Sequence, residues 1–345
     1  MQTLLKAQPK LLEFLGRFTD AFGVKLNPAI LIVREDLFAK LRTTNAIPSF
    51  RDILVASVIP YSRALTIVYR TGNRVCYSAS FWLYPWMVGN DLGHMTMHTP
   101  ALTAFHIVDE FGGQSMPEVP DMQLEARDLD KVLFDALMKR WRRHYIGNRQ
   151  TWEDRALFRS LNMVAQATQL PGGSDVTFYD LCRNAALWVG AFEMLTHPRK
   201  GNSGLQTVYA LLERVFVDDK NLKKQRYVAY MGRAKKPWPR RILPCWLYGR
   251  LYILRNKYLH GNPISKNLLD LKGSEHGLFW MAAPLYRFAL YAFLRMRFRR
   301  KMPPPSKPKA FGRYIADRMT YRDSQDLVER ALLRARNRPQ NKGTP

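Results

Sequence analysis

The residues best suited to chemistry lie in one short stretch, ILRNKYLHGNPIS, at residues 253–265. It contains Arg255, Asn256 and His260. A histidine can take the proton of a ribose 2′-hydroxyl or give one to a leaving 5′-oxygen, and an arginine can bind the phosphate while negative charge develops on it. Asn256 could orient the imidazole or bind a phosphate oxygen, and the neighbouring Lys257 adds positive charge. These residue types therefore predict phosphodiester cleavage that requires no metal and no cofactor.

A helix is expected to position these side chains. In residues 243–260 apolar residues recur at spacings of three and four, and a glycine and a proline follow closely, so we expect the helix to end at His260. The apolar residues are Leu247, Leu251, Leu254 and Tyr258. Asn256 and His260 share a face, and Arg255 lies about 100° from Asn256 around the helix. All three can border one groove if the last turn unwinds or the facing surface is curved. The alternative is that His260 only interacts with the helix dipole and Arg255 only forms a surface ion pair.

The charge of the chain points to a polyanionic partner. Its 345 residues include 54 lysines and arginines against 28 acidic residues, a net charge of +26, and such a charge attracts nucleic acid. RNA is therefore the expected partner, although the same charge could serve solubility or binding to a membrane surface. The three cysteines, Cys76, Cys182 and Cys245, form no C-x-x-C pair. They favour neither a disulfide framework nor a thiolate zinc site, and they are typical of the reducing cytoplasm.

Two regions that differ in residue composition and hydrophobic period predict an α+β protein. Short runs of β-branched and aromatic residues between residues 51 and 84 predict an antiparallel β-sheet, with a Gly-containing hairpin loop at residues 71–73. Residues 27–33 and 100–108 could add strands. The first 18 residues are expected to form a short helix and not an export signal. We therefore predict an N-terminal β-containing domain over residues 1–120, which could act as a sensor.

Long helical periods follow the prolines at positions 117 and 120, and they predict an all-helical bundle over residues 121–302. From Pro303 onward, residues 303–345 are expected to form a basic, proline-rich linker, a polar helix near residues 324–336 and a tail without chemistry. The helices expected in the bundle span residues 122–144, 152–170, 175–197, 204–217, 243–260 and 277–300.

Basic residues alternate with aromatic residues in an insertion over residues 220–241. This pattern can neutralise phosphates and stack unpaired bases, so we predict that the insertion contacts RNA. A solvated loop is the alternative. The predicted RNA-binding residues are Lys223, Lys224, Arg226, Lys235, Lys236 and Arg240.

Two further segments could suggest a membrane span or a metal site. Residues 277–294 are apolar, but Pro284 and Arg287 lie among them. Because an arginine near the centre of a membrane helix costs about 2.5–3.5 kcal/mol, we expect a buried bundle helix and no stable membrane insertion. His94 and His98 could bind one metal ion if their segment were helical, but nearby glycine and proline residues argue against a helix, and no metal site is predicted.

The motif region resembles a known superfamily. Arg255 and Asn256, followed after three residues by His260 at the end of a helix, resemble the R-x4-6-H signature of the HEPN superfamily, in which a polar residue commonly follows the arginine. Glu193, in the earlier segment ALWVGAFEMLTH, matches the acidic residue that the first core helix of this family often carries. It is assigned a supporting role, and it could equally serve only as the partner of a buried arginine. The resemblance covers residues 125–300, and the long basic insertion departs from the family pattern.

The resemblance implies a four- or five-helix bundle that forms a homodimer, with two Arg/His motifs facing each other across a shared cleft. It also implies a metal-independent endoribonuclease that leaves a 2′,3′-cyclic phosphate or a 3′-phosphate. Many members of the family act as toxins or in anti-phage defence, and they are restrained by an antitoxin or by a sensor domain that awaits a trigger derived from the phage. The second hypothesis is a non-catalytic RNA- or partner-binding module that keeps the bundle and the basic surface.

Overall fold

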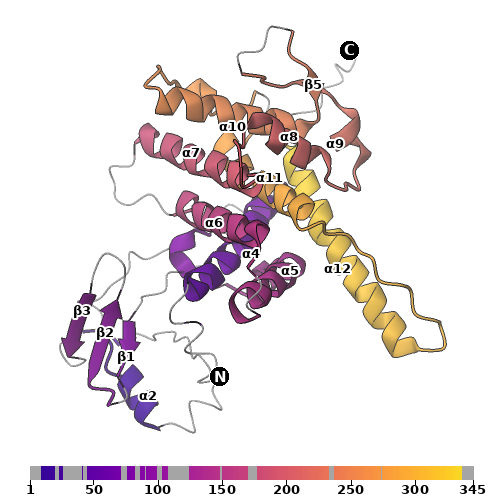
Figure 1. The fold of residues 1–345 in the computed structure, drawn as a ribbon. Coiled ribbons are helices and arrows are strands. Elements are labelled where there is room, and N and C mark those ends of the chain that lie inside the picture. The colour runs from indigo at the N-terminus through magenta and orange to yellow at the C-terminus, as the bar shows by residue number, and fades with distance from the viewer. Residues whose placement is uncertain are drawn as a thin grey trace. The chain divides into compact units, whose positions relative to one another are not determined.

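The chain forms two compact units in the computed structural model (Figure 1), Met1–Ala39 with Trp82–Asp121 and Lys40–Phe81 with Met122–Pro345. The structure describes residues 9–19, 23–25, 41, 45–70, 76–81, 86–89, 91–98, 103–107, 124–147, 150–169, 177–232, 237–272 and 274–335. Helices and antiparallel sheets are both present, which confirms the α+β class.

The smaller unit contains a three-stranded antiparallel sheet. Strands β1 (Trp86–Val88), β2 (His94–His98) and β3 (Thr103–Ile107) lie in that order, with Met95 opposite His106. Helix α2 (Pro9–Leu15) belongs to this unit, and Phe14 and Met95 form its buried cluster. The strand expected near residues 100–108 and the short N-terminal helix are therefore confirmed. The strand considered at residues 27–33 lies outside the described residues.

The β-sheet predicted between residues 51 and 84 is wrong. Residues Ala46–Tyr69 form one helix, α4, and Ser78–Phe81 form a 3-10 turn. The runs of β-branched residues resemble strands because α4 is buried around most of its circumference, which leaves no polar face to reveal a helical period. The proposed hairpin loop at residues 71–73 lies outside the described residues. As a result, Lys40–Phe81 belongs to the helical unit, so residues 1–120 do not form one continuous domain. The division between Asp121 and Met122 nevertheless lies next to the predicted boundary at residue 120.

The helices predicted after residue 120 are confirmed to within a few residues at most ends, although the first begins later than expected and the helix predicted over residues 277–300 ends at Phe293. Figure 1 shows them around α4, which contacts α5, α6, α11 and α12. Their bounds are α5 Lys131–Trp141, which continues as a π-helix over Arg142–Ile146, α6 Trp152–Ala167, α7 Phe178–Leu195, α8 Leu205–Glu213, α10 Leu243–Leu259 and α11 Leu278–Phe293.

The basic insertion is partly packed on the bundle. It forms α9 (Lys220–Lys224) and a two-stranded ribbon of β4 (Tyr227–Val228) and β5 (Arg240–Arg241), and Leu222 and Ala229 within it are fully buried. The Tyr209 hydroxyl of α8 donates to the Tyr230 carbonyl oxygen at 2.8 Å. The Tyr209 hydroxyl lies against Gly249 of α10, where an added Cβ would be 2.6 Å from the hydroxyl oxygen. Glycine is therefore required at this close approach.

The C-terminal segment was predicted in part only. Helix α12 spans Pro308–Leu333, so the expected linker is helical from Pro308 onward. Its first half is exposed and polar, which gives no apolar stripe in the sequence, whereas Leu327, Val328 and Leu332 in its second half are buried. Glu329, which is fully buried, accepts hydrogen bonds from the backbone N–H groups of Asp218 and Asp219. The helix predicted near residues 324–336 is thus confirmed as the second half of α12, and this half is part of the core.

A fully buried ion pair joins three of these helices. The Arg287 side chain of α11 donates from Nε to Asp130 Oδ2 at 2.5 Å and from Nη2 to Tyr291 at 2.7 Å, and neither Arg287 nor Asp130 has an exposed side chain. Asp130 also accepts a hydrogen bond from the Leu133 N–H as the N-cap of α5, and its own N–H donates to the Ser57 carbonyl of α4. The pair therefore fixes α4, α5 and α11 to one another.

Length and hydropathy alone do not distinguish a buried core helix from a membrane-spanning helix in this protein. Helix α4 is long and apolar enough to cross a membrane, with a mean hydropathy of 1.3 over its most apolar window, and 78% of that window is buried. Helix α11 is shorter and buried over Leu278 and Met281–Tyr291, as the sequence predicted for a bundle helix.

We expect Arg287→Met to lower the free energy of unfolding by about 3–5 kcal/mol, because Asp130 would stay buried without its partner. The control is Lys131→Met, which removes an ion pair with Asp135 on the surface of α5 and should change it by less than about 1 kcal/mol. Urea unfolding followed by circular dichroism measures both variants. An equal loss of unfolding free energy in the two variants would show that the buried ion pair stabilises the fold no more than the surface ion pair does.

Candidate functional site

Arg255 stands in the last turns of α10 and is held by three neighbours. Its Nη1 donates to Asn256 Oδ1 at 2.9 Å, and its Nη2 donates to Glu193 Oε2 of α7 at 3.2 Å. The guanidinium carbon lies 5.4 Å from the ring centroid of Tyr252, one turn earlier on α10. The structure therefore brings together Arg255, Asn256 and Glu193, and it fixes the guanidinium direction.

His260 lies at the end of α10 but outside this cluster. It is the C-cap residue, its backbone N–H donates to the Asn256 carbonyl oxygen at 3.1 Å, and its side chain is exposed. Gly261 follows with a φ of 66°, and the Asn262 N–H returns to the Lys257 carbonyl at 2.9 Å, so the helix ends where the sequence predicted. The contacts of the described residues join the imidazole to none of the other three side chains.

Glu193 is the acidic group of the cluster, and its side chain is 16% exposed. Burial raises the pKa of Glu193 above its ordinary value of 4.5, and the charge of Arg255 opposes that shift. The fully buried Tyr248 lies near the pair. Burial, with the charge of Glu193, raises the pKa of its phenol well above the usual value, and its hydroxyl has no hydrogen-bond partner in the described part of the chain. The site thus contains polar groups in a poorly solvated place.

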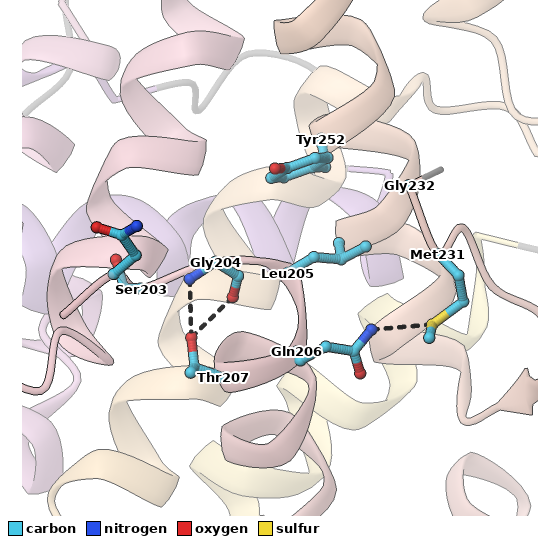
Figure 2. A pocket seen from close by; sticks show the side chains of 9 residues that line it. Ser203, Gly204, Leu205, Gln206, Thr207, Met231, Gly232 and Tyr252 are labelled. Carbon is cyan, nitrogen blue, oxygen red and sulfur yellow. Dashed lines mark hydrogen bonds between the residues drawn. The ribbon is translucent and has the colours of Figure 1, made fainter. Parts of the chain in front are cut away.

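A pocket of about 350 Å³ opens beside this cluster, at the start of α8. Figure 2 shows Tyr252 across the pocket from Thr207, whose hydroxyl accepts from the Gly204 N–H at 3.1 Å and donates to the Gly204 carbonyl at 2.7 Å. Because Tyr252 lines the pocket and also contacts Arg255, a molecule in the pocket would lie one side chain away from the guanidinium.

Four of the predicted RNA-binding residues are described and all four are exposed, namely Lys223, Lys224, Arg226 and Arg240. Lys223 and Lys224 end α9, and Arg240 lies in β5. The other two, Lys235 and Lys236, lie outside the described residues. Within the described ranges, the structure gives no contact between these four side chains and Arg255.

The alternative metal site does not form as the histidine spacing would require. Residues His94–His98 form strand β2, so they are not helical, and His94 pairs with Asp91 at 2.6 Å and stacks on Phe105. Among the residues that the structure describes, no group of three or more His, Cys, Asp or Glu side chains could hold a metal ion.

Comparison of the chain with family models, with curated proteins and with solved structures finds no match. The HEPN resemblance therefore rests on the residues of the motif alone.

Two residues of the site were missed by sequence reasoning. The sequence analysis assigns no role to Tyr252 or Tyr248, yet Tyr252 contacts Arg255 and Tyr248 lies beside the Glu193–Arg255 pair. The signal for Tyr252 was its position three residues before Arg255, since residues at that spacing are neighbours on a helix.

The raised pKa of Glu193 predicts a pH dependence of stability. Because the folded-state pKa lies above 4.5, protonation of Glu193 favours the folded state. Relative to Glu193→Gln, the wild type should be most stable near about pH 4 and should lose that advantage as the pH rises through the folded-state pKa. Urea unfolding of both proteins between about pH 4 and 7 measures the difference, and a constant difference over this range would contradict the raised pKa.

Proposed function

We propose that the protein is a metal-independent endoribonuclease of the HEPN type, whose site is the end of α10. The observation that carries the proposal is the fixed Arg255 guanidinium, held by Glu193 and Asn256, in the same last turns as the exposed His260. An arginine and a histidine so placed supply the two functions that RNA cleavage needs, which are charge stabilisation and proton transfer.

In the proposed reaction His260 takes the proton from the ribose 2′-hydroxyl. The 2′-oxygen then bonds to the phosphorus, and the bond between phosphorus and the 5′-oxygen breaks as that oxygen receives a proton from the His260 imidazolium formed in the first step. Arg255 stabilises the charge that develops on the phosphoryl oxygens. Asn256 acts as a positioning residue through its hydrogen bond to Arg255, as does Glu193. Lys257 adds positive charge beside them. The products carry a 2′,3′-cyclic phosphate and a 5′-hydroxyl.

The proposed active form is a homodimer in the cytoplasm. Helices α5 to α11 would supply the bundle, and a second copy would place its own Arg/His motif across a shared cleft, as the family resemblance implies. The exposed imidazole of His260 is free to meet RNA or a second copy. A role as a toxin or in anti-phage defence, with an antitoxin or a phage-derived trigger as partner, follows from the same resemblance.

One observation favours the second hypothesis, a non-catalytic RNA- or partner-binding module. In the single chain the Arg255 guanidinium is engaged by Glu193 and Asn256, while the His260 side chain stands apart from them. A half-buried ion pair of this kind can serve packing alone.

We expect His260→Ala to reduce RNA cleavage in EDTA by about 10²–10⁴-fold, the usual contribution of a general acid or base. The control is His276→Ala, because His276 belongs to the same unit but contacts Trp280 and lies outside the α10 site. The measurement is cleavage of total RNA and of labelled tRNA, followed by analysis of the end groups. Cyclic-phosphate ends should form with the wild type and the control.

Equal cleavage by wild type and His260→Ala would exclude the proposed site. If neither protein cleaves but both bind RNA equally, the binding-module hypothesis becomes the better account.

A further inference from the structure

A second and larger cleft, of about 640 Å³, lies in the helical unit away from the end of α10. It is bordered by the ends of α7 and α11, by α8, and by the segment that follows α11. Four arginines line it, Arg214, Arg295, Arg297 and Arg299, together with the aromatic residues Phe216, Tyr291 and Phe293. The cleft thus combines a high density of guanidinium groups with aromatic rings.

The four arginines have no carboxylate partner in the part of the chain that the structure describes. Glu153 is the acidic residue of the lining, and it pairs with Arg140 at 3.3 Å. All four arginines are exposed, so their charge faces the solvent of the cleft. A concave surface lined by one sign of charge concentrates the field and attracts the opposite charge.

The end of α11 directs three of the arginines to one side. Arg295 adopts a left-handed conformation with φ of 53°, and the Met296 N–H donates to the Tyr291 carbonyl at 3.0 Å, which ends the helix. The left-handed conformation is less favourable for an arginine than for a glycine. Arg295 therefore occupies the end of α11 despite the backbone strain.

Exposure then alternates along the segment, with arginines exposed at 295, 297 and 299 and the residues between them less exposed. Phe298 packs toward α12, where it meets Tyr314 edge to face. The Met296 carbonyl accepts a hydrogen bond from the Tyr321 hydroxyl of α12 at 3.1 Å, and Met296 itself lines the cleft.

We infer that this cleft binds the phosphodiester backbone of single-stranded RNA. Guanidinium forks match phosphate oxygens, and exposed aromatic faces such as Phe216, which is 52% exposed, can stack unpaired bases. A membrane surface fits less well, because the apolar helix that precedes the arginines is buried and offers no face to lipid.

The choice of RNA as the polyanion rests on the proposed function. The inference adds to that function the path along which the RNA strand would reach the site. Thr207 lines both this cleft and the pocket beside Tyr252, and its hydroxyl lies 3.1 Å from that of Thr196. A strand bound in the arginine cleft can therefore continue past Thr207 to the pocket that adjoins Arg255.

The test compares two triple variants with equal change in charge, both built on His260→Ala so that cleavage cannot confuse binding. The cleft variant is Arg214→Gln, Arg297→Gln and Arg299→Gln. The control variant is Arg159→Gln, Arg313→Gln and Arg318→Gln, which alters exposed arginines outside the cleft. Circular dichroism verifies the fold, and Arg299→Gln alone replaces the triple variant if the triple variant is unstable.

Binding of a fluorescein-labelled uridine homopolymer is measured by anisotropy over a salt series. Each lost phosphate contact lowers the slope of log K against log salt by about 0.7 on single strands, so the cleft variant should lose about two units of slope. Its affinity near about 0.1 M salt should fall roughly 100-fold, while the control variant should stay within about threefold of the parent.

Equal losses in the two triple variants, or no loss in either, would overturn the inference. It would also be overturned if the cleft variant lost binding to phosphatidylserine vesicles but kept RNA, or if polyglutamate competed as well as the RNA does. RNA binding through the cleft without any cleavage by the wild type would support the inference and contradict the proposed function. Cleavage that depends on His260, together with unchanged RNA binding by the cleft variant, would support the proposed function and contradict the inference.

Discussion

Arg287 carries its positive charge into the middle of the helical unit, where removal of the group from water costs several kcal/mol. Asp130 offsets that cost because its carboxylate also caps α5, and its backbone N–H binds α4. The pair can exist in one arrangement of the three helices, since a small displacement of any of them would leave a buried charge unpaired. Tyr291 extends the contact toward α12 through Ser324, at 3.4 Å. The position of α11, and of the arginines that follow it, depends on this pair.

The candidate site depends in turn on α10, which packs against both α7 and α11. Leu247, Leu251 and Leu254 bury one side of α10, and this burial sets the rotation of the helix. The rotation turns Arg255 toward Glu193 of α7 and leaves His260, beyond the last buried leucine, in solvent. The two groups that the proposed chemistry requires therefore differ in environment. One is fixed by packing, and the other is free to approach a substrate.

Sequence reasoning succeeded where the local pattern and the burial agree. The end of α10 was predictable because Gly261 supplies the left-handed conformation that a helix stop uses, and a Glu193 pairing with an arginine was foreseen as the alternative role of that carboxylate. Helix α4 was missed because burial on nearly all sides removes the polar face from which a helix is recognised. The first half of α12 was missed for the opposite reason, since it is exposed and has no apolar stripe. Long-range partners such as Asp130 and Arg287, 157 residues apart, have no local signal.

The net charge of +26 does not show where positive charge accumulates on the molecule. The burial of several aspartate side chains gives part of the answer. Asp52, Asp130 and Asp154 are all buried, and each binds an arginine, so these carboxylates neutralise charge inside the fold. With 28 acidic residues against 54 basic ones, the surface is left with many arginines that lack a partner. Most such residues would be spread over convex helix faces, where water screens them. The arginines after α11 differ because the helix end and the contact of this segment with α12, through Phe298 and the Met296 carbonyl, place them in one cleft, where the same charges act together on a polyanion.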